Sequence, residues 1–443
     1  MKLLIIDQSE CGLALALRAA EYNHIVYWYV EDKPETNQDS GIGIHKNIIK
    51  IKNWLPYATK VDLIVSTDNS NFIPKLDSLR KKGINVFAPT EQLVNLEIKR
   101  EDGLKFLKDH GVKVPEYKTF KNFKQAEKYI TENPKPYVFK TLGDNENKAL
   151  TFVGKTPEQL IQRMREWTTT GVKITGDIML QEFIKGTEIA VSRWIGRDGP
   201  IGDICESFEH KKLFVGEKGP NTGEMGTVSK YVSESKLYDL VLKPLIDDLV
   251  KMGSYTCVDI NCIVDEDGHP WPLEFTSRFG WPAFNLFLLA HKGDPVKWML
   301  DACKGKDTLK ATNDVVIGVV LVLSPFPYND NTINTKNIPI YGLTDQLKKF
   351  IQPQSIMMGK FINKVNGKFE EVEDWVSTGD YLCVITNIGS TVEEARKNVY
   401  SIIDKLAISD LGYRIDIGVK VIEALPKLQK LGYATDWEVI SER

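Results

Sequence analysis

The stretch EHKKLFVGEKGPNTGEMG, residues 209–226, changes character halfway along. Its first part is densely charged, whereas the last eight residues, GPNTGEMG, are half Gly or Pro and carry a single charge, at Glu224. Successive backbone N–H groups in a Gly-rich turn can form a concave site for a carboxylate or a phosphate, and glycine lets the backbone approach a ligand closely. The pattern therefore predicts an anion-binding turn, with an ordinary surface loop as the alternative.

The whole chain has the composition of an ordinary folded protein. Its 443 residues, 42% hydrophobic and 26% charged, allow roughly three domains of about 150 residues each. The net charge of -3 gives no reason to expect a nucleic acid or an anionic membrane as partner, so small-molecule substrates are favoured. The six cysteines show no CxxC spacing, which argues against a disulfide framework or a zinc ribbon and favours a cytoplasmic protein.

The sequence predicts neither a signal peptide nor a membrane-spanning segment. The opening residues, MKLLIIDQSE, read as a first strand and not as a signal peptide. The longest apolar run, VVIGVVLVL at 315–323, is much shorter than the roughly 20 residues that span a bilayer.

Strand-like and helical runs alternate through the first hundred residues. KLLIID, HIVYWYV, VDLIVST and INVFAP are short apolar strands, and helical patterns separate them. Short buried strands with helical crossovers indicate a parallel sheet covered on both faces. We therefore expect an N-terminal α/β domain over residues 1–98.

The later segments mix helices and strands in a different order, which predicts a multidomain α/β and α+β protein. A small unit that resembles a lid covers 119–189, and it contains a helix that starts at Thr156. A central unit is formed by 99–118 and 190–312, and a C-terminal mixed unit by 313–443. In this last unit Thr391 and Glu394 form a capping box for a helix.

Two carboxylates lie on strands that the turn DEDGHP joins as a hairpin. Alternation along these strands places Asp259 and Glu274 in a position to face each other. Mg²⁺ prefers oxygen ligands and keeps substrate phosphates in its coordination shell. The pair suits a magnesium site, and a solvated hairpin face is the alternative reading.

Two further segments have features of a nucleotide site. Lys140 ends the strand PYVFK, and Gly143 and Lys148 lie in the following loop, of the kind that closes over phosphates. The segment LQEFIKGTE brings Glu182 and Glu188 to either side of a turn, where a carboxylate could accept from ribose hydroxyls. A solvent-facing lysine and a charged turn are the plainer interpretations.

Taken in order, these pieces resemble the phosphoribosylamine–glycine ligases, members of the ATP-grasp superfamily. The resemblance runs nearly from end to end, and its best markers are EHKK with GPNTGEMG, then LEFTSRFG at 273–280 and GYRIDIG at 412–418. Several ordered matches are more specific than any one motif. The resemblance implies an ATP-grasp fold with an N-terminal parallel domain, a lid and a C-terminal mixed domain. It also implies ATP-driven activation of an amino-acid carboxylate, from which an amine then displaces phosphate to form an amide.

The resemblance also assigns roles to residues. Lys140, Lys148 and Gly143 would hold ATP phosphates, helped by Arg100 where the family has a lysine. Arg278 would stabilise the acyl phosphate. The adenine would meet Gln181, Glu182, Phe183 and Ile184, the ribose would meet Glu188, and Mg²⁺ or Mn²⁺ would bind Asp259, Glu274 and Thr276. Substrate contacts are expected at Lys211, Gly219, Pro220, Asn221, Thr222, Gly223, Met225 and Gly226.

The chain departs from the family at five further places. Thr276 replaces the family's metal-binding asparagine, and the glycine-rich loop has Asn147 and Ala149 in place of glycines. The turn after the first strand, which in the family receives a ribose phosphate, reads DQSECGL, and its carboxylates Asp7 and Glu10 would repel a phosphate. The proline-glutamate segment of the family is STDNSN at 66–71, and Trp281 and Ala283 replace two acidic residues.

These departures favour a divergent ligase whose amine substrate need not carry a 5-phosphate. We expect a monomer or a homodimer. A true phosphoribosylamine–glycine ligase remains open, with the phosphate contacts rebuilt locally. A nucleotide-binding protein without catalysis is the alternative from another class, since Thr276 weakens the expected metal site. Biotin carboxylases share the scaffold, but GPNTGEMG and GYRIDIG point away from them.

Overall fold

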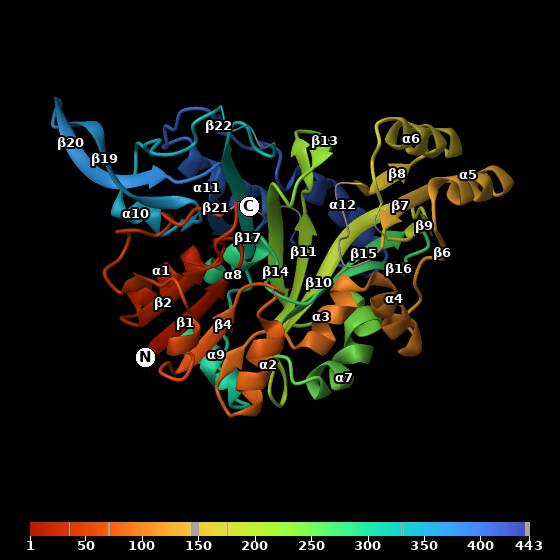
Figure 1. Cartoon of the computed structure of the whole chain (residues 1–443), viewed down its shortest axis with the longest axis horizontal. Helices are drawn as coiled ribbons and strands as arrows, with labels where there is room; N and C mark the ends of the chain where they lie inside the picture. Colours follow the sequence, from red (N-terminus) through yellow and green to blue (C-terminus); the bar gives the residue numbers. More distant parts are fainter. Residues whose placement is uncertain are drawn as a thin grey trace.

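The computed structural model describes residues 1–34, 36–69, 71–142, 150–174, 176–328, 330 and 332–438. The chain forms parallel and antiparallel sheets flanked by helices, as the sequence predicted (Figure 1). Gly143, Lys148 and their neighbours Asn147 and Ala149 lie outside the described residues.

The N-terminal segment forms a five-stranded sheet in the order β3-β2-β1-β4-β5, and every pairing in it is parallel. Five of the six residues of the first strand are buried, because helices cover both faces of the sheet. The predicted parallel sheet is therefore confirmed. Its elements are β1 (Lys2–Asp7), α1 (Leu13–Glu21), β2 (Ile25–Val30), β3 (Ile48–Lys50), η1 (Leu55–Tyr57), β4 (Leu63–Ser66), α2 (Ile73–Lys81), β5 (Val86–Phe87) and α3 (Glu91–Ile98).

A four-stranded antiparallel sheet, β6-β9-β7-β8, carries two helices and lies at the right of Figure 1. The second helix starts as predicted, since the Thr156 side chain accepts from the backbone N–H of Gln159. Asn122 caps the first helix in the same way. The elements are α4 (Arg100–Asp109), β6 (Tyr117–Phe120), α5 (Phe123–Glu132), β7 (Tyr137–Thr141), β8 (Phe152–Gly154), α6 (Pro157–Thr169) and β9 (Ile178–Glu182).

A nine-stranded sheet forms the centre of the molecule, with eight strands in the order β16-β15-β10-β11-β14-β17-β21-β18 and β22 paired to β17. Strand β17 pairs with β14, so strands on both sides of residue 313 belong to one sheet. The strands are β10 (Gly186–Gly196), β11 (Gly199–Glu209), β14 (Gly226–Val232), β15 (Thr256–Asp265), β16 (Pro270–Thr276), β17 (Val315–Leu323), β18 (Ile351–Pro353), β21 (Tyr381–Gly389) and β22 (Leu411–Gly412).

Helices and two small ribbons complete the fold. The predicted cap at Thr391 is confirmed, although Glu394 returns its bond to the N–H of Ser390 and not to Thr391. The helical segments are η3 (Tyr238–Leu242), η4 (Lys243–Leu245), α7 (Ile246–Lys251), α8 (Ala283–Ala290), α9 (Pro295–Cys303), α10 (Asp345–Lys348), α11 (Val392–Ile403) and α12 (Val419–Lys430). The ribbons pair β12 (Lys212–Phe214) with β13 (Lys218–Asn221), and β19 (Ile356–Val365) with β20 (Lys368–Ser377).

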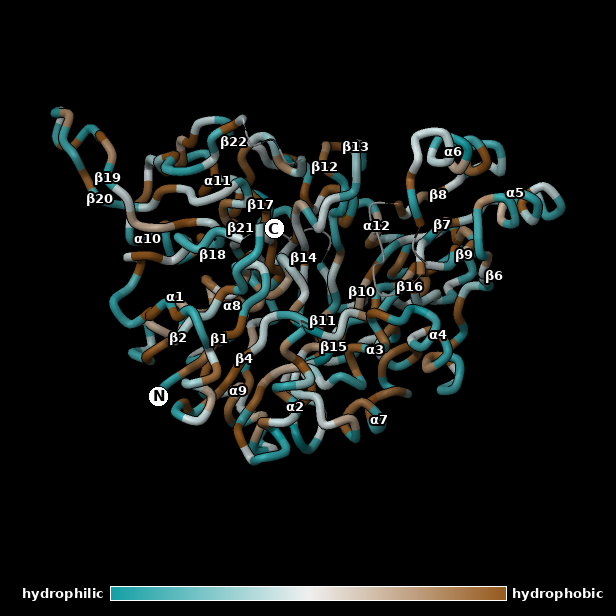
Figure 2. The backbone as a smooth tube through the Cα atoms, viewed as in Figure 1, coloured by the Kyte–Doolittle hydropathy of each residue, from teal (hydrophilic) through white to brown (hydrophobic). Residues whose placement is uncertain are grey.

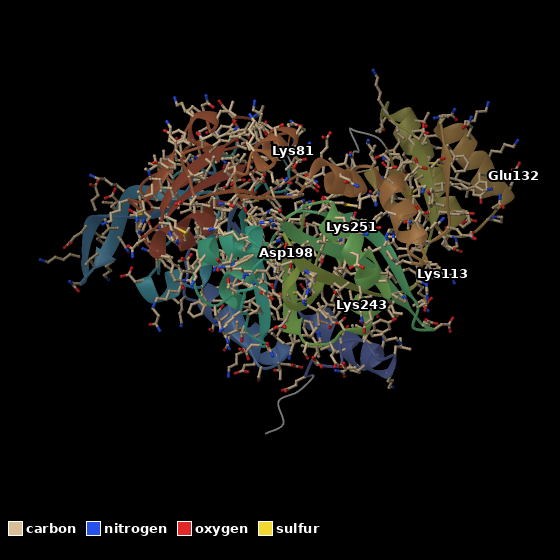
Figure 3. The ribbon with its side chains drawn as sticks, turned by 90° about the horizontal axis from the view of Figure 1, so that it is seen from below. Lys81, Lys113, Glu132, Asp198, Lys243 and Lys251 are labelled. Carbon is tan, nitrogen blue, oxygen red and sulfur yellow. The ribbon has the colours of Figure 1, made fainter. Side chains whose placement is uncertain are left out.

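The hydrophobic core follows the central sheet, whose strands mix brown, white and teal segments in Figure 2. All nine residues of β17 are buried, and full burial of each Val, Leu or Ile contributes about 1.5–3 kcal/mol before entropy is counted. The surface carries charges of both signs on separate elements, such as Lys81, Glu132, Asp198 and Lys251 in Figure 3. All six cysteines are buried and unpaired. Within the described residues, no helix has the length and apolarity to cross a bilayer.

Candidate active site

One face of the central sheet gathers polar side chains from four neighbouring strands. Asn261 of β15 lies directly opposite Glu274 of β16, and Asp259 lies opposite Thr276. Because side chains alternate along a strand, all four share a face. The expectation that Asp259 and Glu274 face each other directly is wrong, since the register sets them two residues apart along the sheet, on the same face.

Lys211 is the centre of this face. Its Nζ lies 3.0 Å from Glu188 Oε1, 2.9 Å from Glu209 Oε2 and 3.7 Å from Glu274 Oε1. The amide nitrogen of Asn261 donates to Glu188 Oε1 at 2.8 Å and to Glu209 Oε2 at 2.9 Å. We call Glu188, Glu209, Asn261, Glu274 and Lys211 the carboxylate cluster. Its charge balance is acidic, so it favours cations.

Electrostatics in the cluster follow from burial and from the single lysine. Burial lowers the pKa of Lys211, but Glu209, Glu188 and Glu274 raise it well above its ordinary value. Burial alone would raise the pKa of Glu188, yet Lys211 holds it below the usual range. For Asp259, burial followed by repulsion from Glu209 raises the pKa well above its ordinary value. A neighbouring cation would therefore favour its ionised form.

The four-stranded sheet β6-β9-β7-β8, which we call the lid sheet, supplies a buried cation. Lys140, 7% exposed on β7, donates from Nζ to Gln181 Oε1 on β9 at 2.8 Å. This lysine does not face solvent, which weakens the plainer reading of it. The Nε2 atom of Gln181 is buried and has no hydrogen-bond partner among the described residues.

The next residues connect the lid sheet to the central sheet. Glu182 pairs with Lys135 Nζ at 2.9 Å, and the backbone N–H of Phe183 donates to Pro136 O at 3.4 Å. Ile184 follows in the segment between β9 and β10. The residues expected at the adenine therefore lie where a nucleotide could contact both sheets.

The two candidate arginines are both held by acidic residues. Arg100, at the start of α4, lies with NH1 3.6 Å from Glu274 Oε2, which attaches it to the carboxylate cluster. Arg278 Nε lies 3.3 Å from Glu97 Oε1 and 3.5 Å from Asp68 Oδ1. Burial lowers the pKa of Arg278, but Glu97 and Asp68 raise it above its ordinary value, so the guanidinium stays charged.

The GPNTGEMG stretch includes the end of β13 and the first residue of β14. Some of its backbone N–H groups are already hydrogen-bonded within the chain. The N–H groups of Thr222 and Met225 donate to the carbonyls of Lys211 and His210. Gly219 has φ +80°, which favours glycine, and a Cβ at Gly226 would lie 2.7 Å from Gly318 O. Local geometry thus explains these two glycines, whereas a Cβ at Gly223 would meet open space. Pro220 and Asn221 lie in β13.

Arg414 of the GYRIDIG segment fixes the other end of this ribbon. It is 1% exposed, pairs with Glu217 at 2.7 Å and Asp416 at 2.8 Å, and donates to Lys212 O. Two segments that the sequence marks separately therefore hold each other in place.

The turn after β1 is closed by its own carboxylates. Asp7 is fully buried and accepts from the backbone N–H of Gly12 at 2.5 Å and of Ser9 at 3.1 Å, and from Trp28 and Thr67. Of the donors at the start of α1, which could hold a phosphate, the N–H of Gly12 is used by Asp7.

Glu10 is buried in the same turn with φ +66°. It accepts from the N–H of Asn37, from Ser40 Oγ at 2.6 Å and from Ser355 Oγ at 3.3 Å. Burial raises its pKa to about 7. The C-terminal part of the chain therefore seals this turn through Ser355.

Sequence reasoning missed Glu209, Asn261, Glu97 and Asp68. Glu209 and Asn261 carried a usable signal, because each lies on a strand face shared with a residue already singled out. Glu97 and Asp68 follow from the docking of α3 and the β4 loop, which no local pattern encodes.

Comparisons with known proteins agree with this geometry. Residues 103–283 match the family "Phosphoribosylglycinamide synthetase, ATP-grasp (A) domain". Phosphoribosylamine–glycine ligases from Streptococcus pneumoniae and Lactococcus lactis are 24% and 27% identical, over 96% and 95% of this chain and 100% of theirs.

Solved structures show the same fold. The phosphoribosylamine–glycine ligase of Thermotoga maritima has a TM-score of 0.67 at 19% identity, and covers 94% of this chain and 100% of its own. A biotin carboxylase from Campylobacter jejuni has a TM-score of 0.62 at 13% identity, with 98% of each chain covered. The chain is therefore similar over nearly its whole length to phosphoribosylamine–glycine ligases, and residues 103–283 match the ATP-grasp domain of that family.

Proposed function

We propose that the protein joins an amino-acid carboxylate to an amine through an acyl phosphate, at the expense of ATP. The observation that carries this proposal is that the chain has both a buried lysine on the lid sheet, Lys140, and a carboxylate cluster on the central sheet. ATP would lie between them. Its phosphates would meet Lys140, with Lys148 and Gly143, its adenine Gln181, Glu182, Phe183 and Ile184, and its ribose Glu188.

The residues of the chain would neutralise charge and hold the reactants in line. A carboxylate is a poor electrophile, so its activation is the costly step, and positioned cations lower that barrier. Lys140 and Arg100 would balance phosphate charge, and Arg278 would stabilise the acyl phosphate. Lys211 and the GPNTGEMG residues would contact the substrates.

The donor set fits Mg²⁺ or Mn²⁺ bound together with the nucleotide. The shared face offers the oxygens of Asp259, Glu274 and Thr276, and Mg²⁺ prefers oxygen ligands completed by phosphates and water. Among the described residues, no group of three or more His, Cys, Asp or Glu forms a metal site alone. The ion would bring Lewis-acid stabilisation of the transferred phosphoryl group.

The acceptor amine, we propose, carries no 5-phosphate. Asp7 takes the N–H of Gly12 and Glu10 takes that of Asn37, so an incoming phosphate would find these backbone donors already occupied. Asp68, on the adjoining β4 loop, adds a third carboxylate.

We propose four units: 1–98 and 119–189, the lid, which have sheets of their own, and 99–118 with 190–312, the centre, and 313–443, which share the nine-stranded sheet. The lid and central units would close on ATP, and the N-terminal unit would face the acceptor.

Two measurements test these proposals together: an assay of ADP release, and calorimetry of ribose 5-phosphate binding. Amino-acid-dependent ADP release supports the ligase, whereas nucleotide binding without any turnover would favour the non-catalytic alternative. Tight binding of ribose 5-phosphate would instead favour a true phosphoribosylamine–glycine ligase.

A further inference from the structure

Asn261 has a buried oxygen that nothing in the described chain satisfies. The residue is 3% exposed, and its Oδ1 has no hydrogen-bond partner among the described residues. Buried polar atoms are nearly always paired, so such an atom indicates a missing partner.

The orientation of the amide is set by its surroundings. Its nitrogen donates to Glu188 and Glu209, both of which can only accept when ionised. A flipped amide would place the oxygen against two carboxylates, so the unsatisfied end must be the oxygen.

The register identifies which residue shares a ligand with Asn261. Asn261 and Glu274 are directly opposite on neighbouring antiparallel strands, where Cβ atoms lie about 4.5–5.5 Å apart. Asp259 is diagonal to Glu274, at about 7–8 Å. One ion bound between β15 and β16 would therefore contact Asn261 and Glu274 more readily than Asp259 and Glu274.

We propose that Asn261 Oδ1 is a direct ligand of the divalent cation, together with Glu274. The proposal rests on the proposed function and deepens it. Thr276 presents only a hydroxyl on this face, and Asn261 supplies an amide oxygen from the neighbouring strand. Lys211 would remain between Glu188 and Glu209.

Mn²⁺ binding to the full-length protein, followed by electron paramagnetic resonance with a non-hydrolysable ATP analogue, tests this directly. We expect Asn261→Ala to weaken Mn²⁺ binding by at least about tenfold. Asn261→Asp keeps an oxygen ligand and should bind Mn²⁺ as tightly as the wild type or more tightly. Asp259→Asn should have a smaller effect than Asn261→Ala.

Asn285 provides a matched control. It is 2% exposed on α8, and its Oδ1 also has no partner among the described residues, but it lies outside the carboxylate cluster. Asn285→Ala should leave the Mn²⁺ affinity unchanged.

Thermal unfolding without metal separates ligation from folding. A folded Asn261→Ala variant that binds Mn²⁺ like the wild type would overturn the inference. If that variant does not fold, Asn261→Asp decides, because a purely structural amide predicts weaker binding there. A wild-type protein that binds no Mn²⁺ with nucleotide would contradict the proposed metal-dependent function itself.

Discussion

The turn after β1 and the carboxylate cluster are both rich in acidic residues, but they use them in opposite ways. In the turn, Asp7 and Glu10 are satisfied by N–H and hydroxyl donors of the chain. In the cluster, three carboxylates share Lys211, and the Asn261 oxygen has no partner among the described residues. A self-satisfied site has no capacity left for a ligand, whereas an unsatisfied one does. Under the proposed function, the carboxylate cluster would therefore bind the metal and nucleotide, and the turn after β1 would not accept a phosphate.

The largest expected effect comes from removing the lid cation. Lys140→Met should reduce ATP turnover by about 100-fold or more, because a buried positive charge near the phosphates is lost. Steady-state ADP release measures it, with Lys121→Met as the control, since Lys121 is exposed and pairs with Asp177. Equal activity in both variants would contradict the proposal that the lid sheet contributes to the nucleotide site.

The cluster should depend on its lysine for stability. Lys211→Met leaves Glu188, Glu209 and Glu274 without their shared partner, so we expect a loss of about 2–3 kcal/mol in the free energy of unfolding. Added Mg²⁺ should recover part of this loss by ligand linkage. Chemical denaturation with and without Mg²⁺ measures both effects. If Lys211→Met unfolds with the same free energy as the wild type, the three carboxylates do not depend on Lys211.

The turn should show itself in the pH dependence of stability. The pKa of Glu10 is raised from 4.5 to about 7, so the folded protein holds a proton that the unfolded chain releases between these values. Its stabilisation is therefore complete below pH 4.5 and is lost as the pH rises through 7. The change is about 3 kcal/mol at most.

Glu10→Gln should flatten this part of the pH profile, as followed by thermal unfolding from pH 4.5 to 7.5. Glu132→Gln, at an exposed position paired with Lys128, should leave the profile as it is. An identical slope in wild type and Glu10→Gln would show that the carboxyl is not sealed in the turn.

The smallest effect is expected where the two regions meet. Asp68→Asn weakens a partly exposed contact to Arg278, so we expect a change of about threefold in KM for the acceptor, with KM for ATP unchanged. Steady-state kinetics with each substrate varied in turn would show it. A matching change in KM for ATP would place Asp68 at the nucleotide instead.

Local patterns predicted the elements better than the contacts. The alternation of strand and helix patterns from KLLIID onwards predicted the parallel sheet. The alternation of side chains along a strand placed Glu274 and Asp259 on one face of the central sheet. The register between β15 and β16 depends on a bulge at Asn261–Cys262, which strand patterns do not encode. The burial of Lys140 and the ion pairs of Arg278 arise from packing between segments that are distant in the sequence. Neither composition nor a local sequence pattern predicts them.

ADP release with MgATP, across the twenty amino acids and with or without phosphoribosylamine generated in place, tests the contrast between the two regions most directly. We predict turnover that requires an amino acid and is indifferent to phosphoribosylamine. Turnover that requires both glycine and phosphoribosylamine would contradict this account, because the closed turn would then still admit a ribose phosphate.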